Sequence, residues 1–128
     1  MHYCTSSAYL ESEHDVMNIE IFCDDTYKGR RLIIKHMSAG LMDWYCGYVQ
    51  LLPTDLCQLK SGDYKDDLDL NPVFDDFYGG VTFLGNLQDK DFPGYYAGFD
   101  TAHPFMEKIT FNDCLNALKK TADRLENL

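Results

Sequence analysis

Residues 110–125 read T-F-N-D-C-L-N-A-L-K-K-T-A-D-R-L, and this stretch decides the fold of the chain. Thr110 is a helix-capping residue, and Asp113 three positions later completes a weaker form of the capping box. The apolar residues that follow recur at spacings of three and four: Phe111, Cys114, Leu115, Leu118, Ala122 and Leu125. A helix with one apolar stripe must cover another element, so we expect a long C-terminal helix packed on a sheet.

The chain before residue 110 supplies the expected sheet. Runs rich in β-branched and aromatic residues predict strands, at residues 16–23, 31–37, 41–52, 81–84 and 95–99. Polar or small residues at 24–29 and 38–40 predict the turns between the first three runs. Because the strands come first and the helix last, the sequence predicts an α+β fold with an antiparallel or mixed sheet of four to five strands.

The run at residues 41–52, L-M-D-W-Y-C-G-Y-V-Q-L-L, is the most strand-like in the chain. Pro53 ends it, since proline cannot donate a hydrogen bond to a neighbouring strand. Gly47 inside the run predicts a β-bulge or a close approach of the backbone to another group. A hairpin that joins this run to the one before it is the simplest topology.

The length of 128 residues indicates a single domain over residues 1–128. We expect the polar residues 1–15 to form a weakly ordered start or a short helix. Residues 54–78 show no clear apolar period among their aspartates, and we expect an acidic insertion there, either a long loop or two short helices. The stretch at 63–69 does not make a calcium loop, because it lacks the turn glycine and the final glutamate.

The chain carries 11 basic and 21 acidic residues, a net charge of −10. This charge argues against direct binding to nucleic acid or to an anionic membrane, because both need basic residues. Residues 55–100 hold ten acids, all of them aspartate, against three bases. The negative charge is therefore concentrated in the middle of the chain and suits a partner with a basic surface. The alternative is that it serves solubility alone.

Within that segment, acidic side chains alternate with aromatic ones. A row of carboxylates imitates a row of phosphates, and aromatic rings supply the anchors that charge alone does not. The residues that we expect to contact a partner are Asp63, Tyr64, Asp66, Asp67, Asp69, Phe74, Asp75, Asp76, Phe77 and Tyr78. The alternative is a hydrated acidic loop.

The residue types that carry chemistry form no complete constellation. Asp100 and His103 follow the last predicted strand and could share a metal or a proton, but one such pair is far short of a full ligand set. A turn in which Asp100 accepts backbone N–H groups is the simpler explanation. We therefore expect no catalytic residues, no metal and no cofactor.

The five cysteines form no close pair, and no secretory signal precedes them. We expect most of them, including Cys46 in its strand-like run, to be buried thiols in a cytoplasmic protein. No apolar stretch of the sequence approaches the length needed to cross a membrane.

Three short motifs occur in order along the chain. They are G-Y-V at 47–49 followed by Pro53, Y-G-G-V-T-F at 78–83, and G-F-D-T-A-H at 98–103. This order, with a helix after it, resembles a family of short uncharacterised proteins encoded by phages and prophages, over roughly residues 30–128. In that family a histidine usually precedes the glycine pair, where this chain has Tyr78, and a His-Pro usually follows the G-Y-V strand. The resemblance implies that only Asp100 and His103 remain of any polar site.

The resemblance also implies an anti-defence role in a bacterial host cell. We expect a non-enzymatic anti-CRISPR inhibitor that binds a basic surface of a CRISPR effector nuclease and blocks its engagement of nucleic acid. Two alternatives stay open, and the oligomeric state with them. One is a small metal-dependent, hydrolase-like enzyme centred on Asp100 and His103, and the other is a self-associating structural or regulatory phage protein.

Overall fold

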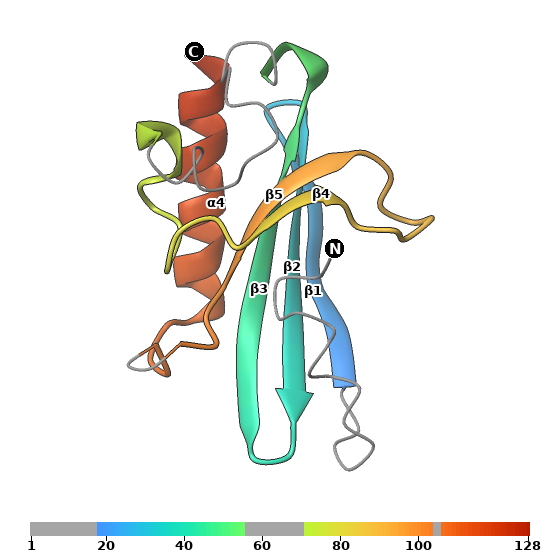
Figure 1. The fold of residues 1–128 in the computed structure, drawn as a ribbon, viewed down its shortest axis with the longest axis vertical. Helices are drawn as coiled ribbons and strands as arrows, with labels where there is room; N and C mark the ends of the chain where they lie inside the picture. The colour runs from blue at the N-terminus through green and yellow to red at the C-terminus, as the bar shows by residue number, and fades with distance from the viewer. Residues whose placement is uncertain (1–17, 56–70, 104–105) are drawn as a thin grey trace.

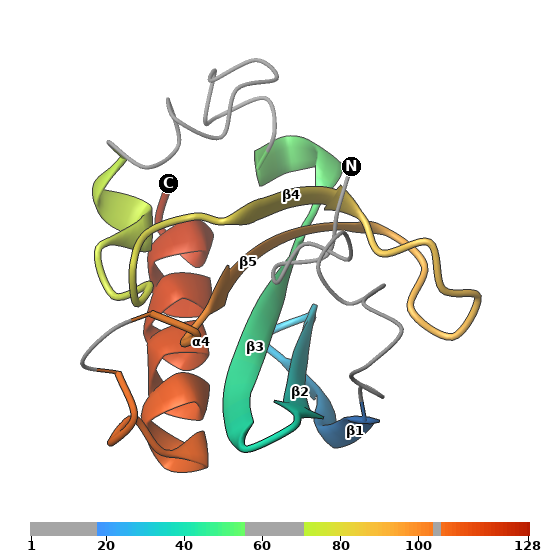
Figure 2. The ribbon, with the colours of Figure 1, turned by 60° about the horizontal axis from the view of Figure 1, so that its bottom comes forward.

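The computed structural model describes residues 18–55, 71–103 and 106–128 of the chain. They form a five-stranded sheet and a C-terminal helix, as Figures 1 and 2 show. The predicted α+β fold is confirmed, and the sheet is antiparallel rather than mixed. The expected weakly ordered start at 1–15 lies outside the described residues, as do residues 56–70 of the acidic insertion.

The sheet follows the predicted runs closely. Its spatial order is β1-β2-β3-β5-β4, and every neighbouring pair is antiparallel. The bounds are β1 Asn18–Tyr27, β2 Arg30–Ala39, β3 Met42–Leu51, β4 Phe83–Asn86 and β5 Tyr95–Asp100. The hairpin expected between β2 and β3 is present, and β1 and β4 are the two edges.

The turn between β1 and β2 is shorter than the sequence predicts. The expected turn over residues 24–29 is wrong, because β1 continues to Tyr27. Only Lys28 and Gly29 remain outside the strands, with positive φ angles of 52° and 80° that suit a tight hairpin turn. Asp24 stays in the strand because its carboxylate accepts from the guanidinium of Arg31 on β2, at 2.7 Å from Nε. The next turn is likewise shorter, because β2 runs through Ala39.

Gly47 marks a close approach and not a bulge. The register of β3 is regular with both of its neighbours. A Cβ added at Gly47 would lie 2.8 Å from the ring of Phe99 on β5. The register shift of the sheet lies instead in β1, between Ile21 and Cys23.

Helix α4 spans Phe111–Glu126 and covers one face of the sheet (Figure 2). The predicted stripe is confirmed for Cys114, Leu118, Ala122 and Leu125, which are buried, while Phe111 and Leu115 are partly buried. The helix packs on β2 and β3, against the side chains of Leu32, Ile34, Val49 and Leu51.

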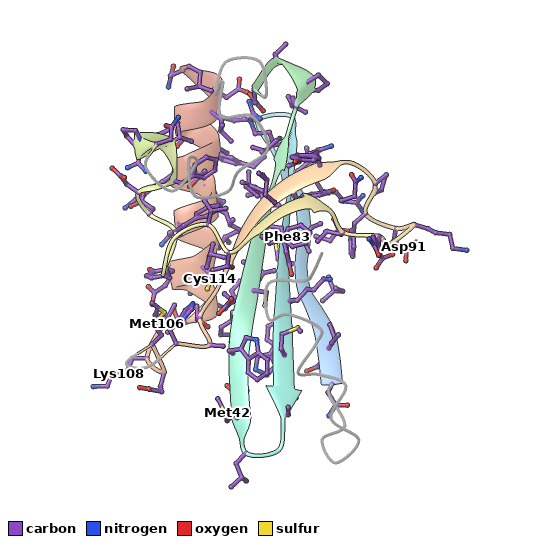
Figure 3. All side chains as sticks on the ribbon, viewed as in Figure 1. Met42, Phe83, Asp91, Met106, Lys108 and Cys114 are labelled. Atoms are coloured by element: carbon purple, nitrogen blue, oxygen red, sulfur yellow. The ribbon has the colours of Figure 1, made fainter. Side chains whose placement is uncertain are left out.

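The opposite face of the sheet carries a second apolar cluster. It contains Trp44, Tyr48 and Tyr96 from the strands, together with Leu87 and Phe92 from the connection between β4 and β5. The ring of Phe83, labelled in Figure 3, packs edge-on against Tyr48 at 5.6 Å between centroids. The central strands are therefore buried on both faces, which explains their nearly continuous apolar sequences.

Cys46 corrects one expectation about the cysteines. It is buried on β3, as predicted, but it is disulfide-bonded and is not a free thiol. Cys23 and Cys114 are free. Disulfides persist mainly in oxidising compartments, so the redox state of Cys46 tests the reducing compartment that the sequence led us to expect.

The helix start provides a stability prediction. The Thr110 hydroxyl accepts from the Asp113 N–H at 3.1 Å, and the Asp113 carboxylate accepts from the Thr110 N–H at 3.0 Å. Replacing Thr110 with alanine removes the acceptor of the Asp113 N–H, and we expect a loss of about 1 kcal/mol in the free energy of unfolding. Urea denaturation measures this loss. Thr110→Ser keeps the hydroxyl and should retain most of the stability, so an equal loss in both variants would contradict the capping role.

Candidate functional site

An open groove of about 440 Å³ lies between residues 75–79 and the first half of α4. The short 3-10 helix η1, Pro72–Phe74, leads into it, and the Asn71 side chain caps η1 by accepting from the Val73 N–H at 3.0 Å. The residues that line the groove are Asp75, Asp76, Phe77, Tyr78, Gly79, Met106, Asp113, Asn116, Ala117 and Lys120. The acidic part of the sequence that the structure describes therefore meets the helix at a concave surface.

The groove is negatively charged. Three carboxylates line it, from Asp75, Asp76 and Asp113, against the single base Lys120. Asp76 is partly neutralised, because its Oδ2 lies 2.5 Å from Nη1 of Arg124 on α4. Asp75 is exposed. Burial first, and then the negative charge of Asp113 and Asp76, raise the pKa of Tyr78, so its hydroxyl stays protonated and able to donate a hydrogen bond.

A second, shallower hollow of about 470 Å³ lies on the other side of η1. Its lining includes Pro72, Val73, Asp123 and Arg124, and it shares Asp75 with the first groove. Asp75 thus lies on the ridge between two concave surfaces, where a partner that enters either of them comes close to its carboxylate.

The predicted contact residues divide into three groups. Asp75, Asp76 and Tyr78 line the groove. Phe74 and Phe77 lie in the core, 3% and 5% exposed, so their rings hold η1 against Phe99 and α4 and are not surface anchors. Both rings are buried because η1 and the residues that follow it pack their apolar side chains against α4. The others, Asp63, Tyr64, Asp66, Asp67 and Asp69, lie outside the described residues.

Sequence reasoning missed the contribution of α4. Asp113, Asn116 and Lys120 line the groove. They occupy the polar side of the predicted helix, where the default expectation is hydration alone. Spacings of three and four do place them on one helix face. No sequence signal says that residues 75–79 pack beside that face.

Asp55 also differs from its expected place in the acidic segment. It is 3% exposed, and its carboxylate accepts from both terminal nitrogens of Arg30, which is 2% exposed. Burial acts to lower the pKa of Arg30, but Asp55 and then Glu126 outweigh burial and raise it. Asp55 therefore contributes to the interior and not to the acidic surface.

Asp100 and His103 do come together. The Nε2 atom of His103 lies 3.1 Å from Oδ1 of Asp100, which is buried at the end of β5. The same Oδ1 accepts from the Ala102 N–H at 3.0 Å, as the turn explanation predicts. Among the described residues, no three His, Cys, Asp or Glu side chains gather closely enough to hold a metal ion.

The buried carboxylate predicts a pH effect. Burial raises the pKa of Asp100 above its ordinary value of 3.8, although the Ala102 N–H, His103 and Thr82 oppose the shift. The folded protein thus binds this proton more tightly than the unfolded chain does. The stabilisation from that proton is complete below pH 3.8 and is lost as pH rises through the folded pKa.

We therefore expect the stability of Asp100→Asn relative to the wild type to rise with pH between 3.8 and neutrality. Urea denaturation across this range measures it. The same comparison in a His103→Gln background removes the imidazole that contacts this carboxylate. A stability difference that is constant with pH in both backgrounds would contradict the raised pKa.

The three sequence motifs meet in the sheet and have a packing role. Gly47 and Gly98 lie on neighbouring strands, and each faces an aromatic ring across the pair, Phe99 and Tyr48 respectively. Gly79 of the middle motif has a φ of 74°, and a Cβ there would lie 3.0 Å from Nε2 of His103. The glycines of the motifs are thus explained by close packing, without a catalytic role.

The free thiols are poorly placed for nucleophilic chemistry. Burial, followed by the charge of Asp113, raises the pKa of Cys114 to about 12. Burial also raises the pKa of Cys23, with Asp25 and Asp24 adding to it. A thiol is reactive as its thiolate, so neither of these two cysteines is set up as a nucleophile.

The comparison with known proteins found no match for this chain. Family models, curated protein sequences and solved structures were all compared with it. Among the described residues, no helix has both the length and the apolar character that a membrane crossing requires.

Proposed function

We propose that this protein is a phage-type anti-defence protein, an anti-CRISPR inhibitor that binds a basic surface of a CRISPR effector nuclease and blocks its engagement of nucleic acid. The observation that carries the proposal is the acidic groove, where Asp75, Asp76 and Asp113 converge from two elements. A surface of this charge competes with phosphates for a basic protein surface and attracts that surface at long range. The net charge of −10 acts in the same direction.

The groove also supplies contacts other than charge. Tyr78 presents a phenol beside the carboxylates, and Gly79 lines the groove next to it. The aromatic contribution that we expected from Phe74 and Phe77 is thus limited to Tyr78 in the described part of the site. The partner that fits this chemistry presents arginine or lysine side chains on a convex surface.

A pull-down against purified CRISPR effectors, with and without guide RNA, tests the class of partner. We expect a stable complex with one effector, and a complex that forms only without guide RNA or only with it identifies the blocked step. If none of the effectors is retained, the anti-CRISPR function fails.

A charge reversal at Asp75 tests the surface. Asp75→Lys leaves the Asp76–Arg124 pair and the capping box in place, so we expect the fold to survive. Affinity for the retained effector should fall about tenfold at low salt, or about 1.4 kcal/mol. The loss should shrink as salt is raised, because exposed charges are screened. Equilibrium titration at two salt concentrations measures both effects.

The matched control is Asp91→Lys. Asp91 is also exposed but lies in the connection between β4 and β5, away from α4 (Figure 3). This variant makes the same change in net charge at a distant place. Equal losses in the two variants would mean that net charge matters and the groove does not. Unchanged affinity in Asp75→Lys would remove the groove from the binding surface.

The proposed target places the protein in the cytoplasm of the bacterial host cell. A disulfide at Cys46 would not persist in a reducing compartment, so the redox state of Cys46 in cells tests this location. Acid trapping and alkylation of thiols in cells that produce the protein test its compartment. In a cytoplasmic protein, Cys46 should be alkylated without prior reduction. Alkylation of Cys46 only after reduction would place the protein elsewhere.

A second candidate function rests on Asp100 and His103. The 3.1 Å contact between them is the observation that favours a small metal-dependent, hydrolase-like enzyme, because a buried carboxylate can orient an imidazole for proton transfer. Metal analysis of the purified protein tests it. Bound metal that is lost in His103→Ala would favour the enzyme, and a metal-free preparation would favour the inhibitor.

A further inference from the structure

Among the described residues, no strand pairs with the outer side of the edge strand β1. Among the described elements it pairs only with β2, along nine residue pairs. Eight of its ten residues are exposed, and the other two are partly buried. A strand at the edge of a sheet presents unpaired N–H and C=O groups, which another extended chain can pair with.

The edge also exposes large apolar side chains on both faces of the sheet. Ile19 and Ile21 are 49% and 45% exposed, and they stand beside Met37 and Lys35 on the face opposite α4. Phe22 is 46% exposed on the helix side, where its ring stacks on His36 at 5.0 Å. A strand alongside β1 would cover these side chains by cross-strand contact.

The charge of β1 indicates the nature of that strand. Glu20, Asp24 and Asp25 are its charged residues, and it has no base of its own. Arg31 pairs with Asp24, and Asp25 is exposed. Among the described residues, Glu20 faces His36, at 3.7 Å. A second copy of β1 would bring the same three acids to this edge, and β1 offers no base to meet them. Like charges brought together across a strand pair are destabilising, so a second copy of this chain is disfavoured.

We propose that the open edge of β1 binds an extended, basic segment of a partner protein by strand addition. Its lysine or arginine side chains lie opposite Glu20 and Asp25, and its apolar side chains cover Ile19 and Ile21. This surface is separate from the acidic groove, because β1 and η1 lie on opposite sides of the molecule (Figures 1 and 2). The inference can therefore fail while the proposed function holds, and the proposed function can fail while the inference holds.

The experiment uses the full chain, labelled with ¹⁵N, and a synthetic peptide of alternating lysine and valine as the probe. We expect amide shifts and slower hydrogen exchange in β1 at millimolar peptide. The same peptide N-methylated at alternate residues loses the donors of one edge, and its affinity should be at least about tenfold lower. Equal binding of the two peptides, or the absence of any change in β1, would overturn the proposal.

Two lysine substitutions complete the test. Ile21→Lys adds a positive charge to the β1 edge and should weaken peptide binding at least about fivefold. Asn86→Lys adds the same charge to the exposed end of β4, the other edge, and should leave binding unchanged. Shifts confined to the acidic groove would overturn strand addition while leaving the proposed function intact. A dimer that is seen by light scattering without peptide and is lost in Ile21→Lys would show that a second copy occupies the edge, contrary to the proposal.

Discussion

Replacing Asp55 with asparagine is expected to lower the free energy of unfolding by about 3–5 kcal/mol. The substitution keeps the shape of the side chain and removes its charge, so the guanidinium of Arg30 stays buried without its main counter-ion. Asp55 also accepts from the Leu52 N–H at 2.6 Å, which ties the end of β3 to the pair. The expected loss is a large fraction of the stability of a small domain, and urea denaturation measures it directly.

The matched control uses the second acid beside Arg30. Glu126 accepts from the same guanidinium at 3.0 Å, but its side chain is 42% exposed. Water replaces most of its interaction, so Glu126→Gln should cost less than about 1 kcal/mol. The double variant Arg30→Met with Asp55→Leu should be more stable than Asp55→Asn alone, because it leaves no buried charge unpaired. If the two single variants cost the same, burial does not determine the strength of this pair.

Replacing Gly98 with alanine is the second large effect, with an expected loss of about 3 kcal/mol. The added Cβ would lie 2.6 Å from Cδ1 of Tyr48 and 2.9 Å from the backbone oxygen of Gly47. Tyr48 is completely buried, so its ring cannot swing out to make room. Either the Tyr48 ring is displaced or the pairing of β3 with β5 is distorted. Urea denaturation measures the combined loss in the free energy of unfolding.

A double-mutant comparison separates these two causes. In a Tyr48→Leu background the smaller side chain relieves the ring clash, and the cost of Gly98→Ala should fall. It should not reach zero, because the contact with the Gly47 oxygen is made by the backbone. An unchanged cost in that background would show that the ring is not the obstacle.

The elements of this fold could be predicted because each obeys a local rule. The stripe and cap at 110–125 require a helix whatever lies beside it, and the capping box forms as predicted. The apolar runs at 31–37 and 41–52 are strands for the same reason. Element bounds were less predictable. Asp24, Asp25 and Thr26 look like turn residues, but they pair in register with β2 and stay in a strand. Their partners are Ile33, Leu32 and Arg31 respectively.

By itself, the sequence determined the α+β class, the C-terminal helix and the concentration of negative charge in the middle of the chain. Only the tertiary structure decided which of those acids are surface and which are interior. Asp55 and Asp75 look alike in sequence, yet one is buried against Arg30 and the other is exposed on the ridge beside η1. The physical reason is that local patterns record a residue's neighbours along the chain. Burial and counter-ions come from residues such as Arg30 and Arg124, which are distant in sequence and brought close by the packing of α4 and β2.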